Sequence, residues 1–222
     1  MSSLPPLLSS QLSSLVKGPA LLPIIQADTP HEAVAIAKAL ADGGVGSVEV
    51  VLRTRQALAA ITAIRTALPD LLVGAGTILS AADANACKDA GAQFLVSPAS
   101  TPTLLEAMIN TGLPLAPGVA TPSEIAMAYE YGLREVKFFP AHLSGGIEML
   151  KALSGVFQQV KFCPTGGIGQ HNLAEFLALK NVFVVGGSWL TPANLVKAQQ
   201  WSQITALAAE ATAIARQIKT AA

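Results

Sequence analysis

Residues 20–52 read ALLPIIQADTPHEAVAIAKALADGGVGSVEVVL, and this stretch decides the fold. An apolar run at 20–27 is followed by a helical stretch at 29–44 and by a second apolar run at 47–52. Short runs rich in β-branched residues predict strands, whereas apolar residues at helical spacing between a threonine and a glycine predict a helix. The segment therefore predicts a strand, a helix and a parallel second strand.

The same unit repeats along the rest of the chain. Further apolar runs, each separated from the next by a helical stretch, are predicted as strands at 71–77, 93–98, 114–119, 135–140, 161–166 and 182–188. Strands that are apolar throughout and alternate with helices predict a parallel sheet covered on its outer face. Eight such units close most economically into a (β/α)8 barrel, the TIM barrel of the α/β class.

The predicted barrel is one domain over residues 1–222, because no Pro/Gly/Ser-rich linker interrupts the repeat. We expect an extra N-terminal helix over 4–17, across the N-terminal end of the barrel, and an eighth helix plus an extension from Pro192 onward. An open doubly wound sheet is the alternative fold. Against it, GAGTIL at 74–79 has Leu79 where the third glycine of a dinucleotide-binding fingerprint would stand.

Composition limits the kinds of partner. The chain has 14 basic and 14 acidic residues, a formal net charge of 0, and 51% hydrophobic against 13% charged residues. No basic field is available to bind nucleic acid or an anionic membrane surface, and no apolar run approaches a membrane span in length. We therefore expect a small-molecule or protein partner, with some apolar surface covered by another subunit.

Cysteines and histidines are few and scattered. Cys87 and Cys163 make neither a metal cage nor a disulfide scaffold, and the N-terminus lacks the basic start of a signal peptide, so we expect a reducing, cytoplasmic setting. His31 and His171 are expected on solvated helix starts, while His142 follows the sixth strand near the mouth of the barrel. Cys163 is expected to pack as a small side chain, and no metal site is expected.

The second strand carries charge on one face. In SVEVVLRT, alternation puts Val48, Val50 and Leu52 toward the helices and Glu49 and Arg53 toward the barrel axis. A charge inside a strand costs desolvation, so it indicates either a function or a partner. Arg53 is nearer the C-terminal mouth, where active sites of this fold lie. A buried ion pair between the two charges is the structural alternative.

The sixth strand, EVKFFP, carries Lys137 on the same face as Glu135 and Phe139. An inward Lys137 enters an apolar setting lined by Phe139, and burial beside the cation of Arg53 favours the neutral amine. Because a neutral amine attacks carbonyl carbon, Lys137 is a candidate nucleophile. A salt bridge to Glu49 is the structural alternative, and Glu135, at the strand start, is expected to be structural.

Glycines mark the ends of three strands. The seventh strand ends in Thr165, Gly166 and Gly167, and the eighth ends in a glycine pair before Ser188. Barrel enzymes commonly bind phosphate at these two positions through backbone N–H groups, so we predict a phosphate site there. The third strand ends in GAGT, where Thr77 offers either a hydroxyl to a ligand or a cap to the next helix.

Five segments resemble a known enzyme family. They are VEVVLRT (48–54), VGAGTIL (73–79), EVKFFPA (135–141), KFCPTGGI (161–168) and GGSWL (186–190), and they look like the 2-keto-3-deoxy-6-phosphogluconate (KDPG) aldolases, a family that includes 4-hydroxy-2-oxoglutarate (KHG) aldolase activity. The resemblance runs from about Leu15 to the last helix. It implies a (β/α)8 barrel, usually a homotrimer, and a class I aldolase that works through a lysine Schiff base without metal or other cofactor.

The resemblance also implies residue roles. Lys137 matches the family's Schiff-base lysine, Glu49 its proton-transfer glutamate and Arg53 its carboxylate-binding arginine. The remaining substrate-binding residues it implies are Thr77, Pro98, Phe139 and Thr165 at the pyruvate end, and Gly166, Gly167, Gly187 and Ser188 toward the phosphate. Two departures bear on substrate preference, since Ala99 stands where the family often has glycine and His142 where glutamate is frequent.

The expected reaction is reversible cleavage of KDPG into pyruvate and glyceraldehyde 3-phosphate, extended to KHG, which gives pyruvate and glyoxylate. A phosphosugar isomerase on the same barrel is one alternative, but it leaves Lys137 without a covalent role. A non-catalytic trimeric binding or assembly protein is another. It accounts for the neutral, apolar composition but not for lysine, glutamate and arginine together at the active end.

Overall fold

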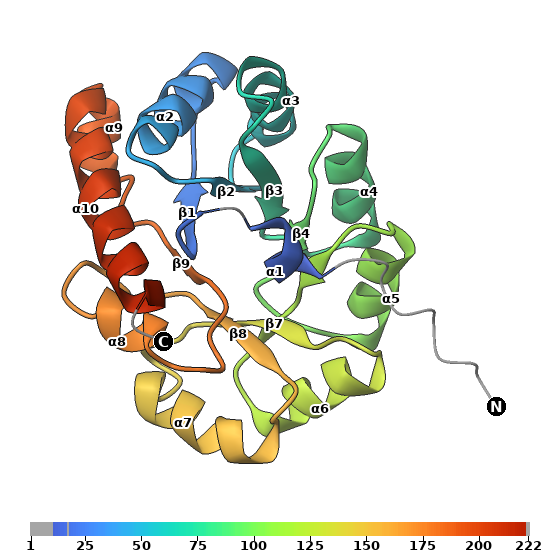
Figure 1. Cartoon of the computed structure of the whole chain (residues 1–222). Coiled ribbons are helices and arrows are strands. Elements are labelled where there is room, and N and C mark those ends of the chain that lie inside the picture. The colour runs from blue at the N-terminus through green and yellow to red at the C-terminus, as the bar shows by residue number, and fades with distance from the viewer. Residues whose placement is uncertain (1–10, 17, 221–222) are drawn as a thin grey trace.

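The computed structural model describes residues 11–16 and 18–220, which form alternating strands and helices (Figure 1). The strands in this part of the chain are β1 (Leu21–Ile25), β2 (Ser47–Val51), β3 (Leu72–Gly76), β4 (Leu95–Val96), β5 (Leu115–Ala116), β6 (Gly118–Val119), β7 (Glu135–Phe138), β8 (Lys161–Pro164) and β9 (Val185–Gly187). The helices are α1 (Leu12–Leu15), α2 (Pro30–Asp42), α3 (Ala57–Ala67), α4 (Ala81–Asp89), α5 (Pro102–Asn110), α6 (Pro122–Glu130), α7 (Gly146–Val156), α8 (Leu173–Leu177), α9 (Ala193–Lys197) and α10 (Trp201–Thr220). Among these described residues, no helix combines the length and apolar character that a membrane span requires.

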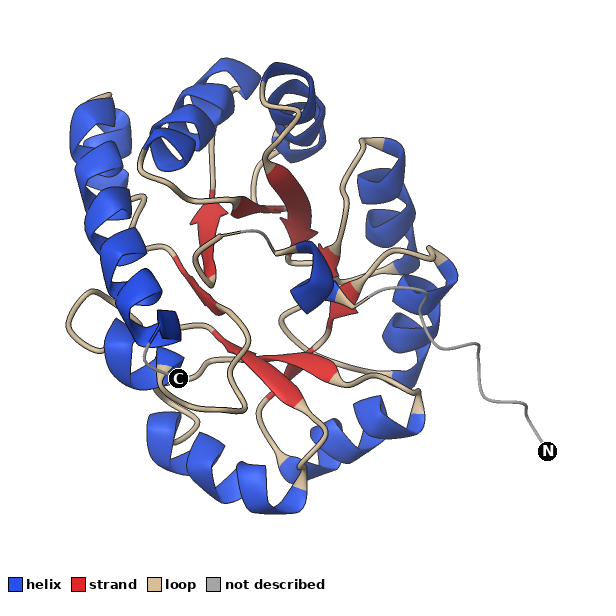
Figure 2. Cartoon of the chain, viewed as in Figure 1, coloured by secondary structure: helices blue, strands red, loops and turns tan. Residues whose placement is uncertain are grey.

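The paired strands run parallel in two sheets, of order β5-β4-β3-β2-β1-β9 and β6-β7-β8. The sheets meet at two places. At one, β5 and β6 follow each other around Pro117. At the other, isolated parallel bridges join Phe162 to Val182 and Thr165 to Gly186. The strands lie around a common centre, with helices α2 to α10 outside them and α1 over the middle (Figure 1 and Figure 2), which confirms the α/β class with parallel strands.

Each of the eight runs predicted as strands contains a strand, but the run at 114–119 is divided in two. Pro117 has no N–H to donate to a ladder, so the run forms β5, which pairs with β4, and β6, which pairs with β7. The Pro117 carbonyl still accepts a hydrogen bond from the Lys137 N–H at 2.8 Å. One proline thus moves the chain from one sheet to the other.

Threonine caps begin several helices, as the sequence predicts. The Thr29 hydroxyl accepts a hydrogen bond from the Glu32 N–H at 3.1 Å at the start of α2, and Thr121 and Glu124 form a reciprocal capping box at α6. The final helix and its extension are α9 and α10, which are separated where Gln199 adopts a φ of 52°.

Alternation along the strands divides the apolar side chains between two cores. Leu21 and Phe162 pack in the large cluster between strands and helices, whereas their neighbours Leu22 and Cys163 pack in a smaller one. We call the smaller one the inner cluster, and it comprises Leu12, Leu22, Leu72, Phe94, Val96, Ala116, Cys163 and Val184. Its members come from α1 and from strands of both sheets with the residues next to them, so the inner faces of the two sheets pack against each other.

The short helix α1 lies within the stretch 4–17 where the sequence predicts an extra N-terminal helix, although residues 4–10 and 17 lie outside the described residues. Leu12 is fully buried in the inner cluster. The first turn of α1 also donates a backbone N–H to Glu135 Oε2 at 3.1 Å, at the start of β7. α1 therefore covers the N-terminal ends of the strands, and Glu135 serves the fold, as expected.

Truncating Leu12 tests this contact. Leu12→Ala removes a fully buried side chain and leaves a cavity, so the free energy of unfolding is expected to fall by about 2–5 kcal/mol. Denaturant titration followed by circular dichroism measures the change. Leu58→Ala, at a side chain 36% exposed, is the control, with an expected change within about 0.5 kcal/mol. Equal stability of Leu12→Ala and the wild type would show that α1 is not docked in this way.

Candidate active site

Lys137 and Glu49 form the centre of the site. Lys137 lies in β7 and Glu49 in β2, and their side chains meet with Nζ 3.0 Å from Oε1 and 3.5 Å from Oε2. Glu49 is fully buried and Lys137 is 5% exposed. Val48 and Val50 pack in the large cluster between strands and helices, on the face opposite to Glu49. The two faces predicted for β2 are therefore confirmed. The salt bridge that the sequence left as an alternative for Lys137 is formed.

Gly76 leaves the space that the Glu49 carboxylate occupies. A Cβ on Gly76 would collide with Glu49 Oε1, and the neighbouring glycine of β3, Gly74, leaves space in the same way for the Phe94 ring. In the sequence, the small residues of GAGT are compatible either with the close approach of a ligand or with a tight turn into the next helix. The structure instead uses them for two side chains that come from other strands, β2 and the start of β4. The paired glycines were visible in the sequence, but their partners were not.

Apolar and weakly polar groups enclose the lysine. The Lys137 Nζ lies 5.5 Å from the centroid of the Phe139 ring. Cys163 lies opposite Lys137 in the register of β7 and β8, and its burial raises the pKa of the thiol to about 12. The thiol is therefore neutral and packs as a small side chain, as predicted. Its Sγ lies 3.8 Å from Oγ1 of the buried Thr165.

Arg53 follows β2 at the carboxyl ends of the strands and is exposed. In the described part of the chain it forms no salt bridge, so the Glu49–Arg53 pair that the sequence left open is not made. Thr77 follows β3 at the same end with a φ of 63°, an unusual value for a β-branched residue. Backbone strain of this kind is concentrated at functional sites.

The loops after β7 and β8 lie against each other. Gly166 and Gly167 have φ values of 100° and 76°, which favour glycine. The His142 N–H donates to the Gly166 carbonyl at 3.0 Å, and a Cβ on Gly167 would collide with the His142 side chain. His142 therefore lies directly beside the predicted phosphate site.

The glycine pair at the end of β9 has a packing explanation. A Cβ on Gly186 would collide with Thr165 Oγ1, and one on Gly187 would collide with the Trp189 ring. Both glycines are buried, whereas Ser188, the next residue, is exposed. The structure thus gives Gly187 a role in packing and leaves Ser188 as the accessible member of this turn.

Pro98 and Ala99 follow β4 at the same end of the strands. Pro98 is half-buried and Ala99 is exposed. A Cβ on Gly118 would collide with the Pro98 backbone, so the start of β6 packs tightly on this turn. The predicted pyruvate-end residues Thr77, Pro98, Phe139 and Thr165 thus all follow strands at the carboxyl ends.

A cavity of about 350 Å³ opens at the carboxyl ends of β1, β2 and β9, and we call it the mouth cavity. Two predicted residues, Arg53 and Ser188, help to line it. Its lining also includes three polar residues that the sequence did not suggest, namely Gln26, Asp28 and Lys197. Gln26 and Asp28 follow the first strand, so the rule that active sites lie at strand ends could have found them. Lys197 lies at the end of α9, and only the fold brings it there.

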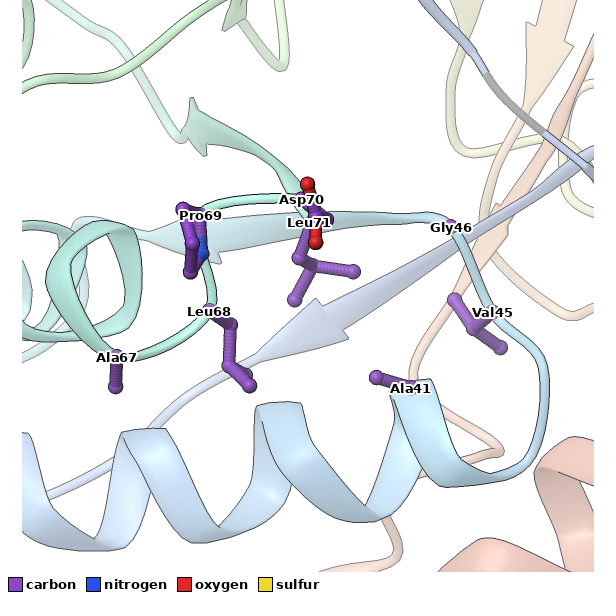
Figure 3. A pocket seen from close by; sticks show the side chains of 8 residues that line it. All are labelled: Ala41, Val45, Gly46, Ala67, Leu68, Pro69, Asp70 and Leu71. Atoms are coloured by element: carbon purple, nitrogen blue, oxygen red, sulfur yellow. The ribbon is translucent and has the colours of Figure 1, made fainter.

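A second hollow of about 350 Å³ lies at the opposite ends of the strands (Figure 3). Gly46 and Leu71, which precede β2 and β3, help to line it, and Asp70 is its charged side chain. One carboxylate among apolar groups makes no catalytic set. No group of three or more His, Cys, Asp or Glu side chains among the described residues is placed to hold a metal ion.

The site thus consists of a buried lysine hydrogen-bonded to a carboxylate, with polar loops above it at the carboxyl ends of parallel strands. This arrangement is typical of α/β enzymes that use a lysine nucleophile. The KDPG and KHG aldolase family model matches residues 12–207 of this chain. The protein belongs to the KDPG and KHG aldolase family.

Individual relatives agree with the family match. The KHG/KDPG aldolase of Escherichia coli K12 is 47% identical over 203 residues, which cover 91% of this chain and 95% of that protein. The KDPG aldolase of Legionella pneumophila, solved with pyruvate captured at low pH as a covalent carbinolamine intermediate, has a TM-score of 0.87 and 43% identity, covering 90% of this chain and 97% of that one. The KDPG aldolase of Zymomonas mobilis ZM4, solved with 3-phosphoglycerate, has a TM-score of 0.83 and 39% identity, covering 90% and 94%.

A methyl group on Gly76 tests the position of the carboxylate. Gly76→Ala must displace Glu49 from Lys137, so the kcat for aldol cleavage is expected to fall by about 10²–10⁴, the range for loss of a positioned base. Steady-state cleavage of KDPG measures it. Gly155→Ala is the matched control, because nothing lies within 4 Å of a Cβ at Gly155. Wild-type kcat in Gly76→Ala would mean that the carboxylate position is not critical.

Proposed function

We propose that this protein cleaves KDPG into pyruvate and glyceraldehyde 3-phosphate, and KHG into pyruvate and glyoxylate, through a Schiff base on Lys137. The buried Lys137–Glu49 pair is the observation that carries the proposal. A distance of 3.0 Å puts a nucleophile and a proton acceptor within one hydrogen bond of each other. The pyruvate carbinolamine of the Legionella relative supports the same chemistry here.

Formation of the Schiff base begins with a proton transfer. The Lys137 ammonium donates its hydrogen bond to Glu49, so passing that proton to the carboxylate leaves a neutral amine. The amine nitrogen then bonds to the C2 carbonyl carbon of the substrate. The carbonyl oxygen takes one proton from the attacking nitrogen and one from Glu49 and leaves as water, which yields the iminium ion and returns Glu49 to its carboxylate form.

Cleavage uses the iminium ion as an electron sink. Glu49, once deprotonated and acting directly or through a water, takes the proton of the C4 hydroxyl, and the C3–C4 bond breaks. The bonding electrons move into the iminium to form an enamine, and C4 leaves as the aldehyde carbon. Glu49 returns the proton to C3, and hydrolysis of the iminium releases pyruvate and free Lys137.

Residues around the pair bind the two ends of the substrate. Arg53 offers a planar pair of N–H donors to the substrate carboxylate. Thr77, Pro98, Phe139 and Thr165 line the pyruvate end in this proposal. Backbone N–H groups of Gly166 and Gly167, with Ser188, bind the phosphate, as the positive φ angles of the glycines favour. The relative solved with 3-phosphoglycerate supports a site for a phosphorylated acid.

We also propose that the two sheets close into one (β/α)8 barrel that forms a single domain over residues 1–222. The bridges between β8 and β9 and the continuity of β5 with β6 support closure. A homotrimer is proposed from the family resemblance. Leu79, Leu143 and Val156 are 63%, 84% and 75% exposed, and apolar side chains of this kind are what a subunit contact covers.

Reductive trapping tests the Schiff base. Borohydride added with pyruvate is expected to inactivate the enzyme and to add the reduced pyruvyl mass to Lys137, because reduction fixes the iminium as a stable amine. Mass spectrometry of a proteolytic digest identifies the labelled residue. Borohydride alone is the control. A label on another lysine, or none, would contradict the mechanism, as would a loss of activity in EDTA that a divalent metal restores.

Substitution of Ser188 tests the phosphate site. A hydrogen bond to a charged group is worth about 1.5–3 kcal/mol, so Ser188→Ala is expected to lower kcat/KM for KDPG by about ten- to a hundredfold. The loss is expected to be nearly absent for KHG, which carries no phosphate. Steady-state kinetics with both substrates measure the difference. Equal losses would assign Ser188 to the fold or to the pyruvate end.

A further inference from the structure

The mouth cavity brings opposite charges together with Ser188, one of the residues of the predicted phosphate site. Arg53 and Ser188 enter it from the ends of β2 and β9, and Asp28 enters it from the end of β1. On the side formed by α9, the charged lining residue is Lys197, the last residue of that helix. The cavity is therefore lined by two cations, Arg53 and Lys197, and by two carboxylates, Asp28 and Glu32, together with Ser188.

Lys197 has no partner within the described residues that would neutralise it. The salt bridges of this part of the chain are Lys38–Asp42, Lys137–Glu49 and Lys151–Glu148. Two further lysines, Lys88 and Lys161, donate to backbone carbonyls. Lys197 makes none of these contacts, so its ammonium is free to bind a ligand that enters the cavity.

Of the two carboxylates that line the cavity, one accepts a hydrogen bond from the backbone and the other does not. Glu32 Oε2 accepts a hydrogen bond from the Asp28 N–H at 2.7 Å, which fixes this carboxylate at the start of α2. The Asp28 carboxylate has no such contact within the described residues. Because carboxylates repel anions and accept from hydroxyls, they restrict an anionic group to the side of Ser188 and Lys197 and leave hydroxyl groups for the side of Asp28.

We propose that Lys197 is a specificity-determining residue that binds the phosphate of the substrate from the mouth cavity, beside Ser188. The proposal rests on the proposed aldolase function. A phosphate near pH 7 carries close to two negative charges, whereas the distal carboxylate of KHG carries one. Lys197 therefore favours the phosphorylated substrate over the dicarboxylate. It acts on binding, because the bond that breaks lies at the buried Lys137.

Charge variants of Lys197 test the proposal. An exposed charge pair is worth up to about 1 kcal/mol, so Lys197→Ala is expected to raise the KM for KDPG by about two- to fivefold, with kcat nearly unchanged. The KM for KHG is expected to rise less. Lys197→Glu is expected to raise the KM for KDPG further, and Lys197→Arg to restore it. Inhibition by inorganic phosphate, used as a probe, is expected to weaken in parallel with the rise in KM.

Lys180→Ala is the matched control, because Lys180 is an exposed lysine near the opposite ends of the strands, before β9. Unchanged KM values in Lys197→Ala and Lys197→Glu, or equal changes for both substrates, would overturn the role of Lys197. Borohydride trapping of pyruvate in the same variants keeps the two proposals apart. Trapping on Lys137 with no Lys197 effect rejects only the specificity residue, whereas a wild-type protein that traps no pyruvate rejects the aldolase function itself.

Discussion

The buried Lys137–Glu49 pair is the interaction on which the rest of the structure depends. An ammonium and a carboxylate that are both removed from water must stabilise each other, so the fold has to keep these two side chains in contact. Burial of either charge alone costs several kcal/mol, and the 3.0 Å contact between them offsets that cost. The residues are 88 positions apart and lie in different sheets, on β2 and β7. The two sheets must therefore face each other at the distance that this contact sets. Gly76 leaves the space that the Glu49 carboxylate needs at that distance.

The strands and the loops divide the chemistry between them. Strands β2 and β7 hold the Lys137–Glu49 pair among apolar neighbours, where the thiol of Cys163 is neutral and the Phe139 ring lies 5.5 Å from the lysine nitrogen. The loops after the strands carry exposed polar groups such as Arg53 and Ser188. In the proposed mechanism, covalent chemistry therefore depends on the packed interior, whereas substrate preference depends on exposed side chains that can change without disturbing it.

Close backbone contacts connect these two parts. The turn after β8 is formed by Gly166 and Gly167, and it lies against His142 from the loop after β7, the strand that carries Lys137. The end of β9 is fixed by Thr165 and Trp189, so Ser188 projects from a rigid turn. A phosphate bound by these turns would be held at a constant distance from the lysine, which is what cleavage of one particular carbon–carbon bond requires.

The sequence by itself determined the order of strands and helices, the inward faces of the second and sixth predicted strands and the candidate charged residues, because alternation and helical spacing are local properties of the chain. It could not decide whether Glu49 would pair with Arg53 or with Lys137, since that choice depends on how β2 and β7 approach each other in space. The tertiary structure alone also assigned Gly76 to the carboxylate and Gly187 to the Trp189 ring, and split the fifth run at Pro117. It brought Lys197 to the mouth as well, because this residue follows the last strand on a helix whose direction no local pattern specifies.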